Sequence, residues 1–400
     1  MQRRQIVFRR SLQGRGKGGR ESITSEFSHP RGIQRRFPRA DCLSLSISSL
    51  LFALHHPTMS TTTNDLVLVS GASGFLGTSV CLAYLEKGFR VRGTVRSQEK
   101  GDAWVQKHPQ WKDKIEFVIV KDVAGANAFD EAVKGVTIVA HTASPFHYDV
   151  KDNEKDMLQP AIEGTRQMMQ ACKKEASVKR VVVTSSFAAV LDMARLPAIG
   201  TTYSDDVWNP ATYDEAKKSD NPAFVYCASK TLAEHAAWDF VKTEKPSFAL
   251  TTVQPPLILG PPSQVIESMK SLNTSAGAVW SVIDADKLPA TSFPVFTDVR
   301  DVAEIHVLAT TEEVAKGQRY LSIAGHFDNS QIAEVIARHF PEQKHRLPKV
   351  DKVEVPEHFA TDSSKVEKQL GIKWIPFEQS IVDTAKSLFA LEAQLKEQQK

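Results

Sequence analysis

Cysteine pairs and long apolar runs are both scarce in this sequence. Its four cysteines, Cys42, Cys81, Cys172 and Cys227, lie far apart and form no CxxC pair. This spacing fits a reducing compartment and argues against a disulfide framework. No HExxH motif or Cys/His cluster occurs, so we expect no metal site. The longest apolar run, residues 43–54, is twelve residues with four serines, which is too short to span a membrane.

A strong charge of one sign is also missing, although the net charge of +3 hides an asymmetry. Residues 1–58 contain eleven Lys and Arg against three acids, a net of +8, so the remaining 342 residues sum to −5. A mildly acidic body argues against a nucleic-acid partner. A chain of 400 residues with 42% hydrophobic residues has ample material for a globular core.

The basic segment 1–58 is rich in Arg, Ser and Gly and shows no persistent helix or strand period. It has three interpretations: an organelle transit peptide, a nucleic-acid arm, or a non-structural extension left by an upstream start. We favour the last, because Met59 stands just before the first predicted strand. We expect this extension to be disordered.

From residue 64 onward, strand and helix patterns alternate, which predicts an α/β fold with a parallel sheet. The predicted strands span residues 66–70, 90–95, 115–120, 138–141, 180–184 and 249–254. The predicted helices span residues 78–87, 97–107, 126–134, 156–175 and 229–243. The strands are apolar without alternation, which indicates burial on both faces of a doubly wound, Rossmann-type sheet.

The pattern changes after Gly260-Pro261-Pro262, then a strand-to-helix pattern resumes at residues 297–310, and a mostly polar helix starts at Phe377. We therefore predict a dinucleotide-binding domain over residues 59–260, completed by about 297–312. Residues 261–400 would form mainly a smaller lobe that shapes the substrate pocket.

A glycine-rich loop joins the first predicted strand to the first predicted helix. Gly71 permits a tight turn, Gly74 admits a pyrophosphate, and Gly77 lets the helix pack on the strand. Phosphates would then lie at the helix N-terminus, where N–H groups and the helix dipole favour anions. The predicted dinucleotide loop comprises Gly71, Ala72, Ser73, Gly74, Phe75, Leu76 and Gly77.

Tyr226 and Lys230 are spaced by four residues in a helical pattern, so they share one face. A neighbouring ammonium favours the phenolate and lowers a tyrosine pKa, which makes the phenol a better acid near neutral pH. About forty residues earlier, a buried strand ends in Thr184, Ser185 and Ser186. Ligands of parallel sheets bind at such strand ends, where a hydroxyl can hold a substrate oxygen.

These motifs resemble the extended short-chain dehydrogenases/reductases, and more closely the dihydroflavonol-reductase-like branch with its fungal NADPH-dependent methylglyoxal/aldehyde reductases. The resemblance rests on the runs SGASGF (70–75), RSQEK (96–100), HTASPF (141–146), TSSFAAVLDMA (184–194), WNPAT (208–212), YCASK (226–230) and TDVRDVA (297–303). It covers residues 66–310, weakens toward the C-terminus and does not include residues 1–58.

The resemblance implies that Tyr226 donates a proton to a carbonyl oxygen, with Lys230 lowering its pKa and holding the nicotinamide ribose. Ser186 would orient the substrate oxygen. Further cofactor contacts are implied at Asp122, Val123, Thr142, Ala143, Ser144, Pro255, Ile258 and Ser275. A substrate pocket is implied at Phe146, Phe187 and Leu257.

Four positions depart from the family pattern and put the pocket's shape in doubt. They are Phe187 and Leu257, where relatives often have tyrosine, together with Gln254 and Pro256. We expect Asp298, Arg300 and Asp301 to tie the two lobes through ion pairs, and His141 to be structural rather than a base.

The residues themselves favour NADP over NAD. An NAD enzyme usually ends its second strand with an acid that binds the ribose 2′-hydroxyl. Here that strand is followed by Arg96, with Lys100 four residues later, and two cations suit a 2′-phosphate.

The sequence thus predicts an NADPH-dependent carbonyl reductase acting on an aldehyde, α-dicarbonyl or ketone. An epimerase or dehydratase on a nucleotide-sugar is the first alternative, but Phe187-Ala188-Ala189 follows Ser186 where a dehydratase needs acids. A non-catalytic NADP-sensing protein is the second, but it has no need of a proton donor. We expect a monomer or homodimer, a cytoplasmic location (mitochondrial if residues 1–58 are a transit peptide), and no membrane or nucleic-acid partner.

Overall fold

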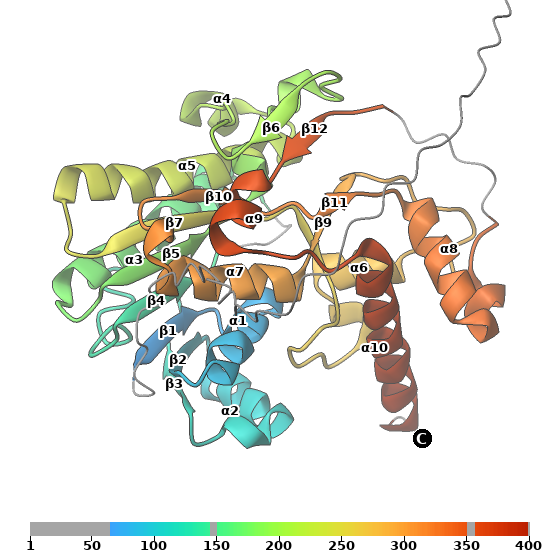
Figure 1. The fold of residues 1–400 in the computed structure, drawn as a ribbon, viewed down its shortest axis with the longest axis horizontal. Coiled ribbons are helices and arrows are strands. Elements are labelled where there is room, and N and C mark those ends of the chain that lie inside the picture. Colours follow the sequence, from blue (N-terminus) through green and yellow to red (C-terminus); the bar gives the residue numbers. More distant parts are fainter. Residues whose placement is uncertain (1–64, 145–149, 350–356, 399–400) are drawn as a thin grey trace, which may run out of the picture. The chain divides into compact units, whose positions relative to one another are not determined.

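The computed structural model describes residues 65–144, 150–349 and 357–398. The expectations for residues 1–58 and for Phe146 lie outside these ranges. Seven parallel strands form the main sheet in the order β10-β7-β5-β4-β1-β2-β3 (Figure 1). These strands are β1 (Leu66–Ser70), β2 (Arg90–Val95), β3 (Ile115–Ile119), β4 (Ile138–His141), β5 (Arg180–Thr184), β7 (Ala249–Gln254) and β10 (Arg319–Leu321).

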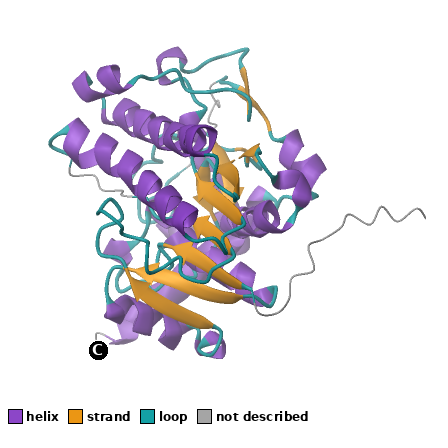
Figure 2. Cartoon of the chain, turned by 90° about the vertical axis from the view of Figure 1, so that its left-hand side faces the viewer, coloured by secondary structure: helices purple, strands orange, loops and turns teal. Residues whose placement is uncertain are grey.

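Helices cover both faces of this sheet, as Figure 2 shows. On one face, α1 (Phe75–Glu86), α2 (Gln98–Lys107) and α7 (Val299–Thr311) enclose a core that includes Tyr84 and Trp104. On the other face, α3 (Gln159–Lys174) and α5 (Pro222–Glu244) enclose a core that includes Met168 and Met169. The predicted doubly wound parallel sheet is therefore confirmed.

Within the described part of the chain, two smaller sheets accompany the main one. The three-stranded sheet has the order β11-β9-β8, from β8 (Leu257–Leu259), β9 (Val295–Asp298) and β11 (Gly325–His326). It shares a hydrophobic cluster with α6 (Thr274–Trp280), α8 (Asn329–His339) and α10 (Phe377–Gln398). The other sheet pairs β6 (Thr202–Ser204) with β12 (Ala360–Asp362), and two short helices are α4 (Tyr213–Lys218) and α9 (Ser364–Leu370).

The seventh strand, β10, lies beyond the 297–312 stretch that was expected to complete the nucleotide-binding domain. It pairs with β7 through Arg319, Tyr320 and Leu321. Three residues are too few to give a strand pattern in the sequence. The chain therefore returns to the main sheet after it has built β8, β9 and α6 of the smaller part.

The predicted helix over residues 126–134 was wrong. The chain there makes successive turns, closed by bonds such as Ala128 N–H to Gly125 O (3.1 Å) and Asp130 N–H to Asn127 O (3.1 Å). Asn127 has φ +58°, a left-handed conformation that breaks a helix. Phe129 and Val133 are still buried, so the apolar spacing reflects burial rather than helix.

Helix α5 begins at Pro222, seven residues before the predicted start. The Asn221 side chain accepts hydrogen bonds from the amides of Ala223 and Phe224, and proline at the first position needs no acceptor. These two features extend the helix over Tyr226. Among helices of the described ranges, none is long and apolar enough to cross a membrane.

Candidate active site

The predicted site residues follow the carboxyl ends of the parallel strands. The glycine loop follows β1, Arg96 follows β2, Asp122 and Val123 follow β3, Thr142 to Ser144 follow β4, Ser186 follows β5 and Pro255 follows β7. Because all these strands run parallel, their carboxyl ends meet at one edge of the sheet. This edge is where ligands of doubly wound sheets bind.

The backbone of the glycine loop is closely packed at its glycine positions. Gly71 has φ +68°, and its carbonyl oxygen accepts the amide of Gly74 at 2.9 Å. A Cβ atom on Gly77 would lie 2.1 Å from the Gly71 oxygen, far inside van der Waals contact. Gly77 is therefore required for α1 to start directly against the loop.

The N-terminus of α1 is open to an anion. Its N-cap residue, Gly74, has no capping side chain, and the first turn contains no acidic residue. The positive end of the helix dipole and the first amide groups are thus left for a ligand. A tight glycine turn with no room for a Cβ atom at Gly77, together with an uncapped helix start, fits the pyrophosphate of a dinucleotide.

The two cations expected to bind a 2′-phosphate stand at the end of β2 and in the first turn of α2. The Arg96 side chain is exposed. The Lys100 ammonium pairs with Glu267 at 2.7 Å, so a segment beyond β8 reaches α2. No acid directly follows β2, which is consistent with a phosphate rather than a free ribose hydroxyl there.

The segment after β4 is fixed by Ser70 at the end of β1. The Ser70 oxygen accepts the amide of Ala143 at 2.9 Å and lies 2.8 Å from His141 Nδ1, and the Thr142 hydroxyl donates to the Ser70 carbonyl at 2.6 Å. Burial lowers the pKa of His141 to about 4, so this histidine is neutral near pH 7. It is a structural residue, as expected.

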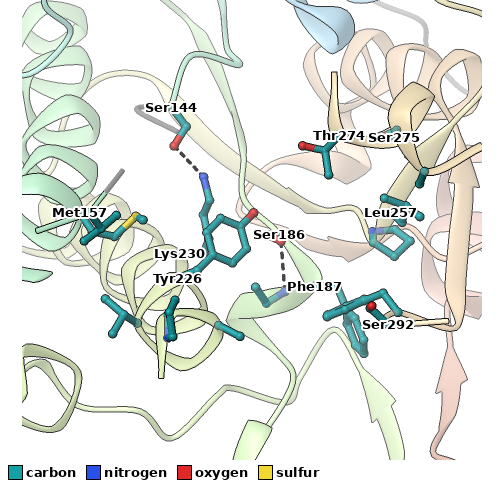
Figure 3. A pocket seen from close by; sticks show the side chains of 18 of the residues that line it. Ser144, Met157, Ser186, Phe187, Tyr226, Lys230, Leu257, Thr274, Ser275 and Ser292 are labelled. Carbon is teal, nitrogen blue, oxygen red and sulfur yellow. Dashed lines mark hydrogen bonds between the residues drawn. The ribbon is translucent and has the colours of Figure 1, made fainter. Parts of the chain in front are cut away.

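Tyr226 and Lys230 lie on one face of α5. The Lys230 ammonium lies 5.5 Å from the centre of the Tyr226 ring and donates to the Ser144 hydroxyl at 2.6 Å. Burial lowers the pKa of Lys230 to about 8. In Figure 3 the Tyr226 hydroxyl points toward Ser186, while the Lys230 ammonium points toward Ser144.

Ser186 is the N-cap of a short 3₁₀ turn after β5. Its hydroxyl oxygen accepts the amide of Ala188 at 3.1 Å, which holds the side chain toward the cavity. The backbone on either side is bonded to β7 and the residue after it, Ser185 N–H to Val253 O and Phe187 N–H to Pro255 O, both at 2.8 Å. A polar side chain fixed in this way can orient a ligand oxygen.

Ser186, Tyr226 and Lys230 open into one cavity of about 1360 Å³. Of the residues predicted for the cofactor or the substrate, its walls include Phe75, Leu76, Thr142, Ser144, Phe187, Leu257, Ile258 and Ser275. Five other predicted residues lie near the same edge of the sheet but do not line this cavity: Arg96, Lys100, Asp122, Val123 and Pro255.

Other parts of the wall were not predicted from the sequence. Four separate segments contribute further residues that line the same cavity: Met157, Val225, Ser292, Phe293 and Phe327. They carry no motif or common spacing, so only the fold brings them together. Together with Phe187 and Leu257 they make much of the wall apolar.

The smaller part of the fold is joined to α7 by ion pairs. Arg300 donates to both carboxylate oxygens of the buried Asp298 at 2.8 Å and to Asp383 of α10 at 2.7 Å. Asp301 accepts the amide of Ile375 at 3.0 Å. Burial raises the pKa of Asp301 to about 6. The Arg300–Asp383 ion pair agrees with the expected structural role of this motif, whereas Asp301 contributes a hydrogen bond to a backbone amide.

Comparison with known proteins agrees with this geometry. A family model described as the 3-beta hydroxysteroid dehydrogenase/isomerase family matches residues 68–327. A Schizosaccharomyces pombe protein, described only as an uncharacterized oxidoreductase, is 44% identical over 326 residues, which cover 81% of this chain and 97% of that protein. The NADPH-dependent methylglyoxal reductase of Saccharomyces cerevisiae is 35% identical over 348 residues, covering 82% and 99%.

Among solved structures, the fold is similar to that of yeast methylglyoxal/isovaleraldehyde reductase complexed with NADPH. The TM-score is 0.76 at 34% identity, and the match covers 82% of this chain and 99% of that one. The family match, the relatives and the glycine loop with its Tyr–Lys helix all lead to one assignment. The chain belongs to the 3-beta hydroxysteroid dehydrogenase/isomerase family of extended short-chain dehydrogenases/reductases, and it is an oxidoreductase.

Proposed function

We propose that this protein is an NADPH-dependent carbonyl reductase with Tyr226 as the proton donor. One observation carries the proposal: Ser186, Tyr226 and Lys230 line the same cavity at the sheet edge that also holds the glycine loop. The yeast relative is named as an NADPH-dependent methylglyoxal reductase, and its structure is a complex with NADPH. A homologous structure from Candida albicans is also an NADPH complex.

The chain's residues fit this cofactor. The Gly71–Gly77 turn and the uncapped start of α1 would hold the pyrophosphate. Arg96 and Lys100 would bind the 2′-phosphate, and Lys230 would bind the nicotinamide ribose. The further proposed contacts to the cofactor are Asp122, Val123, Thr142, Ala143, Ser144, Pro255, Ile258 and Ser275. Bound there, the cofactor would supply the hydride for the carbonyl carbon.

The protein's own contribution is orientation and proton transfer. The Ser186 hydroxyl donates a hydrogen bond to the carbonyl oxygen and so places it near Tyr226. The Tyr226 hydroxyl gives its proton to that oxygen as it gains negative charge. The Lys230 ammonium, held by Ser144 at 2.6 Å, stabilises the phenolate that remains.

The apolar walls near this position suit a carbonyl compound with an apolar part. Phe187, Leu257 and Phe293 offer no charge to a substrate, and Ser292 is a small polar neighbour. An aldehyde, α-dicarbonyl or ketone is the substrate class that these walls and the proton donor suit. The buried apolar run Phe187-Ala188-Ala189 disfavours the dehydratase alternative, because it places no acid after Ser186.

The test is a screen for carbonyl-dependent NADPH oxidation over aldehydes, diketones, ketoesters and flavonols. With a good substrate, Tyr226→Phe should lower kcat by at least ~100-fold, in line with the usual contribution of a general acid. Ser186→Ala should lower it less. The matched control is Tyr213→Phe, which removes a phenol that bonds Glu154 outside the catalytic set. If Tyr226→Phe retained near-wild-type turnover, the acid assignment would be wrong.

A cytoplasmic location and a monomeric or homodimeric state remain predictions. Fractionation of cells that express the full chain tests the first, because a transit peptide would place the protein with mitochondria. Light scattering of the purified protein tests the second. Neither outcome affects the assignment of Tyr226.

A further inference from the structure

A buried carboxylate lies on the catalytic face of α5. Glu234 is 1% exposed and follows Tyr226 and Lys230 by eight and four residues. Residues spaced by four share a helix face, so the three side chains form one row. The proposed chemistry gives Glu234 no role, yet burial of a charge is costly unless it is fully bonded.

Glu234 is bonded by groups from β7 and β10, from the residue after β5, and from its own helix. The Ser185 hydroxyl donates to it at 2.5 Å, the Thr252 hydroxyl at 2.8 Å, and the Gln254 amide at 2.8 Å. Arg319 of β10 adds an ion pair at 2.8 Å, with both side chains under one-tenth exposed. The Trp238 indole completes the set at 3.3 Å.

Arg319 is itself held rigidly. Its guanidinium lies 3.7 Å from the centre of the Trp208 ring and donates to the carbonyls of Asp205 and Val207, both at 2.6 Å. Every polar group of the pair therefore has partners. A pair bonded this completely is rigid, and a rigid pair can fix the position of one structural element relative to another.

The bonded residues stand next to residues of the proposed site. Ser185 precedes Ser186, and Gln254 precedes Pro255. One carboxylate thus ties the ends of β5 and β7 to the helix face that carries Tyr226 and Lys230. Thr252, by contrast, lies inside β7, two residues before the strand's end.

We propose that Glu234 is a positioning residue that sets the Ser186 hydroxyl against the Tyr226 hydroxyl, acting through the Ser185 side chain. Arg319 holds the carboxylate in place through the 2.8 Å ion pair. This inference rests on the proposed function, because it assigns a role within that reaction. Glu234 does not touch the substrate; it fixes the separation of two groups that do.

A matched pair of hydroxyl deletions tests the proposal. Ser185→Ala and Thr252→Val each remove one hydroxyl that donates to Glu234, but only Ser185 adjoins a catalytic residue. We expect Ser185→Ala to lower kcat at least ~10-fold, since small displacements of catalytic groups are costly. Thr252→Val should leave kcat within about twofold, because its strand position does not move Ser186. NADPH affinity should change little in either variant, and the melting temperature should fall by a similar amount in both, because each loses one buried hydrogen bond to Glu234.

A conservative replacement provides the rescue. Ser185→Thr keeps the hydroxyl, and Ser185 borders a small cavity of about 20 Å³ together with Lys230 and Glu234. It should restore kcat to near the wild-type value. If the alanine variant does not fold, Ser185→Cys keeps the volume with a weaker donor and should give an intermediate kcat.

Two results overturn the inference. One is an unchanged kcat in Ser185→Ala. The other is an equal fall of kcat in Ser185→Ala and Thr252→Val that follows the fall of their melting temperatures, because a merely structural role would give that result. Tyr226→Phe is measured alongside. Full activity of Tyr226→Phe, or no carbonyl reduction by the wild type, overturns the proposed function itself. An inactive Tyr226→Phe with an unaffected Ser185→Ala overturns the positioning role alone.

Discussion

The Lys230 ammonium donates to the Ser144 hydroxyl at 2.6 Å and so joins α5 to the segment after β4. Burial lowers the pKa of Lys230 to about 8, so its charged form is present below that pH and lost above it. We expect kcat/KM to fall as the pH rises through about 8, because neutral Lys230 no longer stabilises the Tyr226 phenolate. In Lys230→Arg, whose guanidinium stays charged, the residual activity should lack this fall. A wild-type profile that stays level well above pH 8 would contradict the assignment.

The close approach of Gly77 to Gly71 predicts a loss of cofactor binding in Gly77→Ala. The new Cβ would lie 2.1 Å from the Gly71 oxygen, so the loop must shift. We expect a loss of stability of ~1–3 kcal/mol, typical of overpacking, and a large loss of NADPH affinity by fluorescence titration. The control is Gly277→Ala within α6, where a Cβ meets nothing within 4 Å. That variant should bind NADPH normally and gain ~0.5–1 kcal/mol.

Arg96 is predicted to set the preference for NADPH. A hydrogen bond to a charged group contributes ~1.5–3 kcal/mol, so Arg96→Ala should weaken NADPH binding by roughly 10–100-fold and leave NADH binding unchanged. Calorimetric titration with each cofactor measures this directly. Arg90→Ala is the matched control, because Arg90 is also exposed but stands at the amino end of the same strand. An unaltered NADPH/NADH ratio in Arg96→Ala would remove the 2′-phosphate argument.

Asp301 gives a stability prediction with a defined sign. Burial raises its pKa from 3.8 to about 6 in the folded protein. The folded state therefore binds the proton more tightly than the unfolded state, and this carboxyl lowers the free energy of unfolding as the pH rises from about 4 to 6. Over this pH range the free energy of unfolding falls by about 3 kcal/mol through Asp301, at 1.36 kcal/mol per pKa unit.

Asp301→Asn cannot titrate and should lack this decline. Denaturant unfolding at pH 4 and at pH 7 should therefore show the variant gaining stability relative to the wild type at the higher pH, while its side-chain oxygen can still accept the Ile375 amide. A difference between the two proteins that does not depend on pH would refute the assigned pKa.

Local patterns were enough to predict most of the main sheet. The strands β1, β2, β4, β5 and β7 have the predicted bounds, because apolar β-branched runs between turn residues leave few alternatives. The site motifs were also visible, since the glycine loop and the Tyr226–Lys230 pair depend on spacing within one element. The start of α5 was missed although Asn221-Pro222 is a start signal readable from sequence.

The remaining features depend on contacts between distant residues. The Glu234–Arg319 pair joins positions 85 residues apart, and Lys100–Glu267 joins positions 167 apart. From the sequence, Glu234 can be recognised only as an acid on the inner face of a predicted helix. Nothing in the sequence identifies Arg319 as its partner. The apolar wall that includes Phe293 and Phe327 likewise exists only once the smaller part of the fold has formed.

The late return of the chain to the main sheet matters for how the protein is made. During synthesis, β7 emerges about sixty residues before β10, so the edge of β7 has no partner strand and Glu234 has no cationic partner until Arg319 has left the ribosome. A fragment cut at residue 260 would keep the whole glycine loop and the Tyr–Lys helix, but it would expose a strand edge and an uncompensated buried charge. The nucleotide-binding half is therefore a poor candidate for expression as a separate domain.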